Sequence, residues 1–186
     1  MDAGWFRLEE AKLYTRAAAR PKLYLSAFGP QAARIAGRFG DGIWTLGDPE
    51  SAPEILDAYR ESCREHGKDA GEVIFQTGMA WGESDEAALE GARRWKPTQM
   101  EEVYRDDLSD PEEMQRLADE QVSDEQFAEE GFLVGADLEE KVERIRQMEE
   151  AGATVVSLQL IGQADPLGTI RTYGEHMQPA LRDERT

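Results

Sequence analysis

Cysteine and histidine are scarce in this chain of 186 residues, which holds one cysteine, Cys63, and two histidines, His66 and His176. A single thiol excludes an intrachain disulfide and a thiolate metal site. Two isolated histidines without His-x-x-x-His or Glu-x-x-His spacing argue against a transition-metal site. Cys63 falls inside the helical pattern EILDAYRESCREHG. We expect an inert helix thiol rather than a reactive one, although Arg60 and Arg64 nearby are a weak hint of a lowered pKa.

Long apolar runs are also missing. No window approaches the roughly 18 apolar residues that a membrane span needs. The first residues, MDAGWFRLEE, have neither the basic start nor the apolar run of a signal peptide. We therefore expect a cytoplasmic protein. The length allows one domain with a core, and no low-complexity linker divides the chain, so residues 1–186 are predicted to form a single domain.

Basic residues are outnumbered: 39 acidic residues face 21 basic ones, only five of them lysine, and the net charge is −18. Nucleic acid and anionic membranes would be repelled, so we expect neither as a partner. The acidic surface either recruits a cationic partner or is a hydrated surface suited to high intracellular salt, and we favour the second interpretation. Stability that rises in molar salt would support it, and indifference to salt would remove it.

Four segments rich in β-branched or aromatic residues have the pattern of strands: residues 23–27, 42–46, 73–81 and 154–161. The last begins as an almost continuous apolar run, which is typical of a parallel strand covered on both faces. Helical patterns alternate with these segments, which predicts an α/β fold with a parallel sheet and right-handed crossovers. Four β/α units are half of an eightfold barrel.

Capping signals mark where the helices begin. Pro30 is suited to the first turn of a helix over residues 30–38, and further helices are expected over 54–66, 84–95 and 169–181. Four pairs with capping spacing predict helix starts: Ser51–Glu54, Ser109–Glu112, Ser123–Gln126 and Asp137–Glu140. The span of about seventy residues between the third and fourth predicted strands is long for one connection, so we expect a helical insertion over about residues 84–131.

The turn after the first predicted strand is a candidate anion site. In residues 26–32, SAFGPQA, small residues end the strand, Gly29 permits close approach to the backbone, and the next helix presents free N–H groups. Phosphate or carboxylate binds at such a turn through oriented amides and the helix dipole. Many turns of this kind bind no ligand, so the pattern alone leaves both interpretations open.

Three stretches resemble the luciferase-like, coenzyme F420-dependent oxidoreductases. YLSAFGPQAARIAGRFGDGIWTL resembles the region after the fifth strand of that family, VIFQTGMAWGESDEAA its seventh strand and following helix, and FLVGADLEEKVERIRQMEEAGATVVSLQLIG its final helix and eighth strand. GWFRLEEAKLYT resembles the family's GRYY-like entry sequences. The resemblance covers nearly the whole chain. It implies the C-terminal half of a (β/α)8 TIM barrel, strands 5 to 8, with a helical insertion before the last strand.

In the family, the turn after the fifth strand holds the phosphate-bearing tail of the deazaflavin cofactor through backbone amides. The resemblance therefore implies that cofactor-binding residues are Ala27, Phe28, Gly29, Pro30, Gln31 and Ala32. The expected cofactor is coenzyme F420. FMN, used by related monooxygenases, stays an alternative because this half of the barrel does not separate the two.

The resemblance also bears on the substrate. The family's sugar-phosphate enzymes bind their substrate with a Thr and a Lys after the sixth strand and with a further Lys and Arg. Here residues 46–49, LGDP, hold no basic residue, which argues against a sugar phosphate. Arg105 is a candidate substrate contact or an ion-pair partner of neighbouring acids. Trp44, at a strand end, is a pocket aromatic or a core residue.

The proton-transfer residues of the family, a His and a Glu, belong to the first half of the barrel, and no residue here matches them. We predict no catalytic residue and no metal ligand. The expected function is the C-terminal portion of an F420-dependent oxidoreductase that transfers hydride to or from a small organic substrate; the alternative is a non-catalytic remnant or cofactor-binding half-barrel. Because a half-barrel exposes unpaired edges and apolar faces, we expect a homo-oligomer or association with an N-terminal half-barrel.

Overall fold

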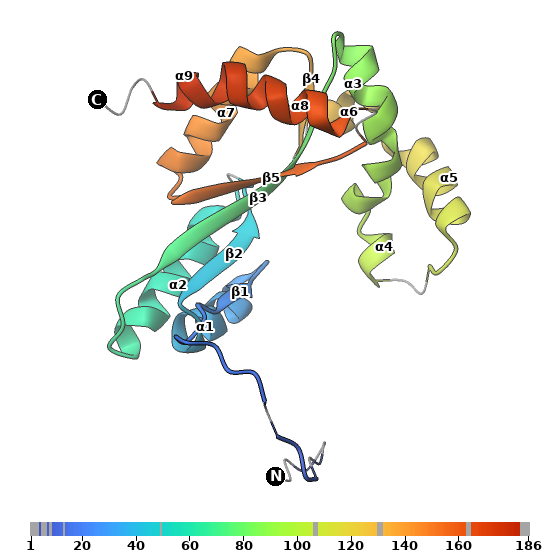
Figure 1. Cartoon of the computed structure of the whole chain (residues 1–186). Helices are drawn as coiled ribbons and strands as arrows, with labels where there is room; N and C mark the ends of the chain where they lie inside the picture. The colour runs from blue at the N-terminus through green and yellow to red at the C-terminus, as the bar shows by residue number, and fades with distance from the viewer. Residues whose placement is uncertain are drawn as a thin grey trace.

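Five parallel strands form one sheet in the described part of the chain. The computed structural model describes residues 4, 7, 9–12, 14–48, 50–105, 108–129, 132–162 and 165–182. The strands are β1 (Tyr24–Ser26), β2 (Gly42–Leu46), β3 (Glu72–Trp81), β4 (Leu133–Gly135) and β5 (Val155–Leu160) (Figure 1). All four pairings between them are parallel, which confirms the predicted α/β class. None of the helices in these residues has the length and apolar character needed to cross a bilayer.

The long strand β3 organises the sheet. Ile74 pairs with both β2 and β5, so these two strands lie on opposite edges of β3. Met79 pairs with both β4 and β5, which places β4 on the same edge as β2, beyond the end of that strand. The sequence pattern missed β4, because three residues are too few to show a strand period. β1 completes the sheet on the outer edge of β2.

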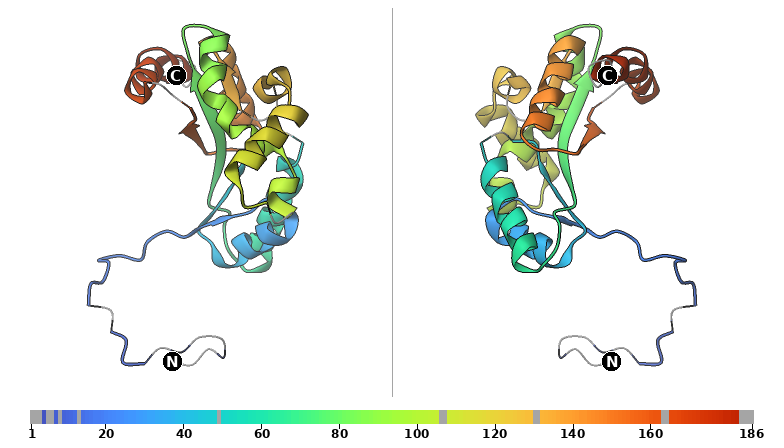
Figure 2. Two further views of the ribbon diagram at one scale, coloured as in Figure 1. Left: turned by 90° about the vertical axis from the view of Figure 1, so that its right-hand side faces the viewer. Right: turned by 90° about the vertical axis from the view of Figure 1, so that its left-hand side faces the viewer.

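Helices follow the strands in the order expected of β/α units. The first two are α1 (Pro30–Phe39) and α2 (Ala52–Glu65), and Figure 2 shows both on one side of β3, while residues 14–23, before β1, extend away on the other. The insertion between β3 and β4 comprises α3 (Asp85–Ala92), the 3₁₀ segment η1 (Arg93–Gln99), α4 (Glu102–Arg105), α5 (Pro111–Gln121) and α6 (Asp124–Glu129). The last part holds α7 (Leu138–Glu150), α8 (Pro166–Thr172), the π-helical turn η2 (Tyr173–Met177) and α9 (Gln178–Arg182).

Two of the predicted caps form and two do not. The Asp137 carboxylate accepts the N–H groups of residues 139 and 140, and the Ser123 hydroxyl accepts that of residue 126, as predicted. The prediction for Ser51 was wrong: its backbone is helical and its hydroxyl donates to Asp48 instead. The prediction for Ser109 was also wrong, because Asp110 caps α5. At α5 the neighbouring aspartate thus replaces the serine as cap, whereas α2 begins without a side-chain cap because the Ser51 hydroxyl is bonded to the Asp48 carboxylate.

The last helix also begins earlier than predicted. α8 starts at Pro166 rather than at Thr169. Asp165 accepts the N–H of Gly168 at 2.9 Å and so caps the first turn, with Pro166 following it. The pair Asp-Pro, read from the sequence only as part of the approach to the helix, is its start signal.

The apolar core lies between the sheet and its helices. Ile43, Phe75 and Val73 pack with α1 and α2, while Val156 and Leu158 pack with α7 and η2. Cys63 is buried in the first of these clusters, where its thiol lies 3.7 Å from a carbonyl of α1, as expected of an inert helix thiol. Because side chains alternate along a strand, the residues between these core positions point to the other face of the sheet.

That other face, called the inner face below, carries Ser26 of β1, Trp44 of β2, Gln76 of β3, and Ser157 and Gln159 of β5. Leu46, Ile74 and Val155 lie on it too; Ile74 is buried, and Leu46 and Val155 are 48% and 41% exposed. In a closed barrel this face would point inward. It is more polar than the layers of branched side chains that usually fill such a barrel.

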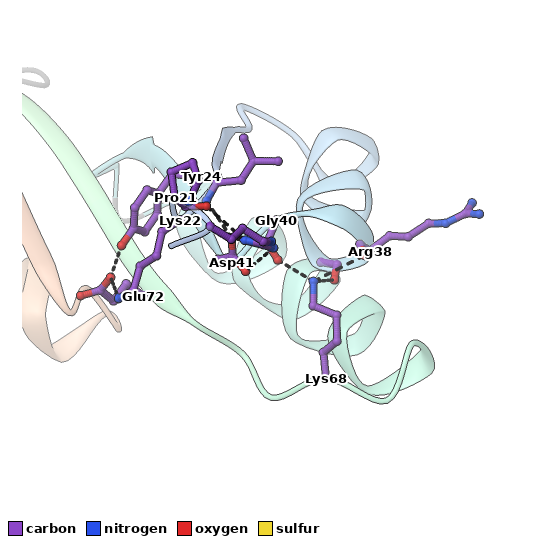
Figure 3. A network of polar contacts seen from close by, with 11 residues as sticks. Pro21, Lys22, Tyr24, Arg38, Gly40, Asp41, Lys68 and Glu72 are labelled. Carbon is purple, nitrogen blue, oxygen red and sulfur yellow. Dashed lines mark hydrogen bonds and ion pairs between the residues drawn. The ribbon is translucent and has the colours of Figure 1, made fainter. Parts of the chain in front are cut away.

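A polar network fastens the N-terminal ends of the strands (Figure 3). The Glu72 carboxylate accepts from the Tyr24 hydroxyl and from Lys22 Nζ at 3.0 Å. These hydrogen bonds, that of Tyr24 first, hold the pKa of Glu72 below its ordinary value. Lys68 Nζ donates to the last carbonyls of α1, including that of Gly37 at 3.0 Å, and so caps its C-terminus. The polar side chains of this network are bonded within the fold, so we look for a functional site at the C-terminal ends of the strands, where barrels of parallel strands place theirs.

Candidate functional site

The turn from β1 to α1 presents unpaired amides. The Ala27 N–H donates to the Trp44 carbonyl at 2.9 Å and prolongs the pairing of β1 with β2. Gly29 is the N-cap of α1 and has no side chain to accept a hydrogen bond, while Pro30 has no N–H. The first N–H of the helix that finds a partner is that of residue 33, which donates to the Gly29 carbonyl at 3.0 Å. Within the described residues, the amides of Gln31 and Ala32 are therefore open donors.

The space above this turn is free. A Cβ added at Gly29 would meet nothing within 4 Å. Gln31 is exposed, the first turn of α1 contains no acidic residue, and Phe28 is 67% exposed. The geometry thus fits a phosphate group, held by the two amides and the positive end of the helix dipole. The cofactor roles of the six residues from Ala27 to Ala32 stay predictions, and the backbone of the last two carries them best.

The nearest cation on α1 does not add to this site. Arg34 contacts two carboxylates of α2, Glu61 and, at 3.6 Å, Glu65. Its charge is therefore engaged on the outer side of the helix pair. An anion at the turn would be bound by backbone dipoles rather than by a formal positive charge.

Beside the turn, a chain of neutral hydrogen bonds crosses the inner face. Trp44 Nε1 donates to Gln76 Oε1 at 2.9 Å, and Gln76 Nε2 donates to Gln159 Oε1 at 3.1 Å. Trp44 thus touches both features, through its carbonyl to the turn and through its indole to the glutamines. This hydrogen bond agrees with both interpretations of Trp44, because the indole N–H of a packed tryptophan also needs an acceptor. The role of Trp44 as a substrate contact stays a prediction.

Sequence reasoning missed both glutamines. The available signal was a polar residue at a facing position inside two strands that otherwise read as buried, VIFQTG and VVSLQL. Such a residue needs a hydrogen-bond partner or faces a polar cavity. Naming the partner required the register of β5 against β3, which the sequence pattern does not supply.

The loop after β2 carries a negative charge. Asp48 accepts the N–H groups of Glu50 and Ser51, each at 3.1 Å, and the Ser51 hydroxyl. Partial burial opposes ionisation of Asp48, but these hydrogen bonds outweigh it and hold its pKa below the ordinary value. An anionic substrate group would meet a carboxylate here. Arg105, the other predicted substrate contact, ends α4, and its side chain lies outside the described part of the structure.

Two buried lysines are engaged within the fold. Lys141 is 3% exposed, and its Nζ donates to the Gly135 carbonyl at 2.8 Å and to that of Asp137 at 3.3 Å. Burial lowers its pKa. Lys96 is 5% exposed and pairs with Asp124 at 2.5 Å. Lys141 therefore joins the end of β4 to α7, and Lys96 joins η1 to α6. Neither ammonium is presented to a ligand at the turn.

Comparison with known proteins adds to this picture. Residues 3–155 match the luciferase-like monooxygenase family. An F420-dependent glucose-6-phosphate dehydrogenase of Intrasporangium calvum is 34% identical over 97% of this chain and 55% of its own length, and one of Microbacterium testaceum is 32% identical over 97% and 54%. The structure of an F420-dependent secondary alcohol dehydrogenase in complex with an F420-acetone adduct superimposes with a TM-score of 0.84 at 27% identity, covering 98% of this chain and 56% of that one. The chain spans about half the length of the relatives it matches.

Proposed function

Because the chain belongs to the luciferase-like monooxygenase family, we propose that it forms the C-terminal half of an F420-dependent oxidoreductase. The observation that carries the proposal is the turn between β1 and α1, whose open amides at Gln31 and Ala32 fit the phosphate of the cofactor tail. When bound, the deazaflavin supplies or accepts the hydride. The residues of this chain bind the tail and line one side of the pocket.

The substrate is proposed to be a small organic molecule without a phosphate group. Asp48 stays ionised after β2, and the side chains that cross the inner face, Trp44, Gln76 and Gln159, are neutral. A dianionic sugar phosphate would find repulsion where the family's sugar-phosphate enzymes place a Lys. This composition supports a substrate recognised through neutral hydrogen bonds.

The inner face is proposed to be completed by four further β/α units that form the first half of the barrel. Among the residues that the structure describes, β1 and β5 are each paired on one edge only. Exposed apolar side chains flank both: Ile35 and Phe39 are 53% and 55% exposed on α1, and Leu167 and Ile170 are 72% and 54% exposed on α8. Unpaired edges and apolar helix faces on both flanks support a partner that closes both sides at once.

The test is a fluorescence titration of F420 against the 186-residue chain, alone and mixed with the part of the Intrasporangium calvum relative that this chain does not match. A parallel titration uses FMN. We expect F420 to bind the mixture, and to bind it more tightly than FMN does. Tighter binding of FMN would favour an FMN-dependent monooxygenase, and binding of neither cofactor would leave the non-catalytic remnant; either result refutes the proposal.

A further inference from the structure

The hydrogen-bond chain across the inner face has a fixed direction. An indole N–H can only donate, so the group of Gln76 that meets Trp44 must be its carbonyl oxygen. The NH₂ of Gln76 then points to Gln159, which must offer its own oxygen in turn. The amide orientation of both glutamines is thereby fixed by the donor and acceptor chemistry of their neighbours. We infer that Trp44 and Gln76 orient Gln159 so that its NH₂ is presented to the barrel interior, where it donates to a carbonyl oxygen of the ligand.

The position of Gln159 agrees with this role. Gln159 pairs with Gly78, two residues beyond the last β3 residue that pairs with β2, so it lies toward the C-terminal ends of the strands. Its neighbours Leu158 and Leu160 pack on the opposite face against the core. Gln159 is exposed, and its Nε2 has no hydrogen-bond partner among the described residues. The inference rests on the proposed function, because this face becomes the wall of a pocket only when the barrel is closed.

The chemistry selects a neutral acceptor. The Gln159 amide donor in a closed pocket is best matched by an oxygen that carries no proton of its own. A carbonyl oxygen meets this requirement, and it has no negative charge for the chain's net charge of −18 to repel. A carbonyl oxygen has two sources here, the ring of the deazaflavin and a carbonyl substrate. Both present the same group, so the experiment separates them.

The measurement is ¹H–¹⁵N NMR of side-chain amides in the ¹⁵N-labelled chain, bound to the unmatched part of the Intrasporangium calvum relative. Gln159→Leu assigns the resonance. A shift of the Gln159 NH₂ signal on addition of F420 alone identifies the cofactor ring as the source. A shift only when acetone, the carbonyl probe, is added to the F420 complex identifies the substrate. An NH₂ signal that neither ligand moves, while fluorescence shows F420 bound, overturns this inference alone; no F420 binding refutes the proposed function and this inference with it.

Two substitutions at Gln76 separate orientation from a merely structural role. In Gln76→Glu the carboxylate accepts from both neighbours, so Gln159 turns its NH₂ toward residue 76 and its oxygen toward the ligand. We expect the ligand that moves the Gln159 signal to bind about tenfold or more weakly. In Gln76→Met, Gln159 is free to rotate and still donates, so the loss is about threefold or less.

A structural role predicts the reverse order. Glutamate has the shape of glutamine and keeps the bond to Trp44, whereas methionine leaves the indole N–H without its partner. If Gln76→Met weakens ligand binding more than Gln76→Glu, with both complexes intact by sedimentation, the orienting role is refuted.

Discussion

A single isosteric substitution, Gln31→Glu, tests the proposed phosphate site at the turn before α1. Gln31 is exposed and occupies the second position of the helix, after Pro30. The substitution changes no volume and places a negative charge beside the open amides of the first turn. A carboxylate there favours the helix dipole, so we expect the folded state to gain about 0.3 to 1 kcal/mol.

The same charge opposes a phosphate. Two unit charges 4 Å apart interact by about 1 kcal/mol in water and by about 4 kcal/mol at an effective dielectric constant of 20. The turn is open to solvent, as the free space above Gly29 shows, so a value of about 1 to 2 kcal/mol applies. The affinity for F420 should fall by about 5- to 30-fold, and more steeply at low ionic strength.

The assay is fluorescence titration of the closed complex with F420 and, as the control, with the same deazaflavin lacking its phosphate-bearing tail. We expect the affinity for F420 to fall and that for the control to stay unchanged, while urea unfolding shows no loss of stability. Equal losses for both ligands would mean that Gln31 acts through the fold. No loss for F420 would mean that the phosphate binds elsewhere.

Two further predictions concern stability. Gly91 on α3 lies so close to the loop after β5 that an added Cβ would be 1.6 Å from the Gly162 carbonyl oxygen. Gly91→Ala should therefore lower the free energy of unfolding, measured in urea, by about 2 kcal/mol or more. In the control Gly174→Ala the added Cβ meets nothing within 4 Å, so its effect should be neutral or stabilising by up to about 1 kcal/mol; equal effects of the two substitutions would contradict the close contact. Asp124 receives hydrogen bonds from Arg93 and then Lys96, which lower its pKa from 3.8 to about 2. Because the pKa is lower in the folded state than in the unfolded chain, ionised Asp124 stabilises the fold at pH values above the unfolded-state pKa. This stabilisation is lost as the pH falls from about 4 to 2. Since the side chain is 39% exposed, screening reduces the contribution to about 1 kcal/mol; Asp124→Asn should abolish this part of the acid dependence, and an unchanged pH profile would contradict it.

Long, strongly patterned elements could be predicted from the sequence. β3 and β5 have runs of β-branched and aromatic residues. At the start of α7 the carboxylate of Asp137 accepts hydrogen bonds from two backbone amides. β4 could not be predicted, because Leu133–Gly135 gains its strand geometry from pairing with β3 and not from a period of its own. The cap prediction for Ser51 was wrong because a competing acceptor lies nearby: the Asp48 carboxylate, three residues earlier, accepts hydrogen bonds from the Ser51 hydroxyl and N–H.

The candidate site divides in the same way. The turn before α1 is a local feature, so it could be predicted directly from Gly29 and Pro30 in the sequence. The hydrogen-bond chain from Trp44 to Gln159 joins three strands, of which two are separated by the whole insertion. Its existence depends on which strands become neighbours and in which register, and a pattern along one strand holds no information on either.

Sedimentation equilibrium of the 186-residue chain, alone and mixed with the part of the Intrasporangium calvum relative that it does not match, tests most directly whether this chain is one half of a barrel. The exposed inner face and the apolar residues Ile35, Phe39, Leu167 and Ile170 on its flanks predict a one-to-one complex in the mixture. A folded chain that stays monomeric both alone and in the mixture would contradict it, as would a stable complex of two copies that the added part does not displace.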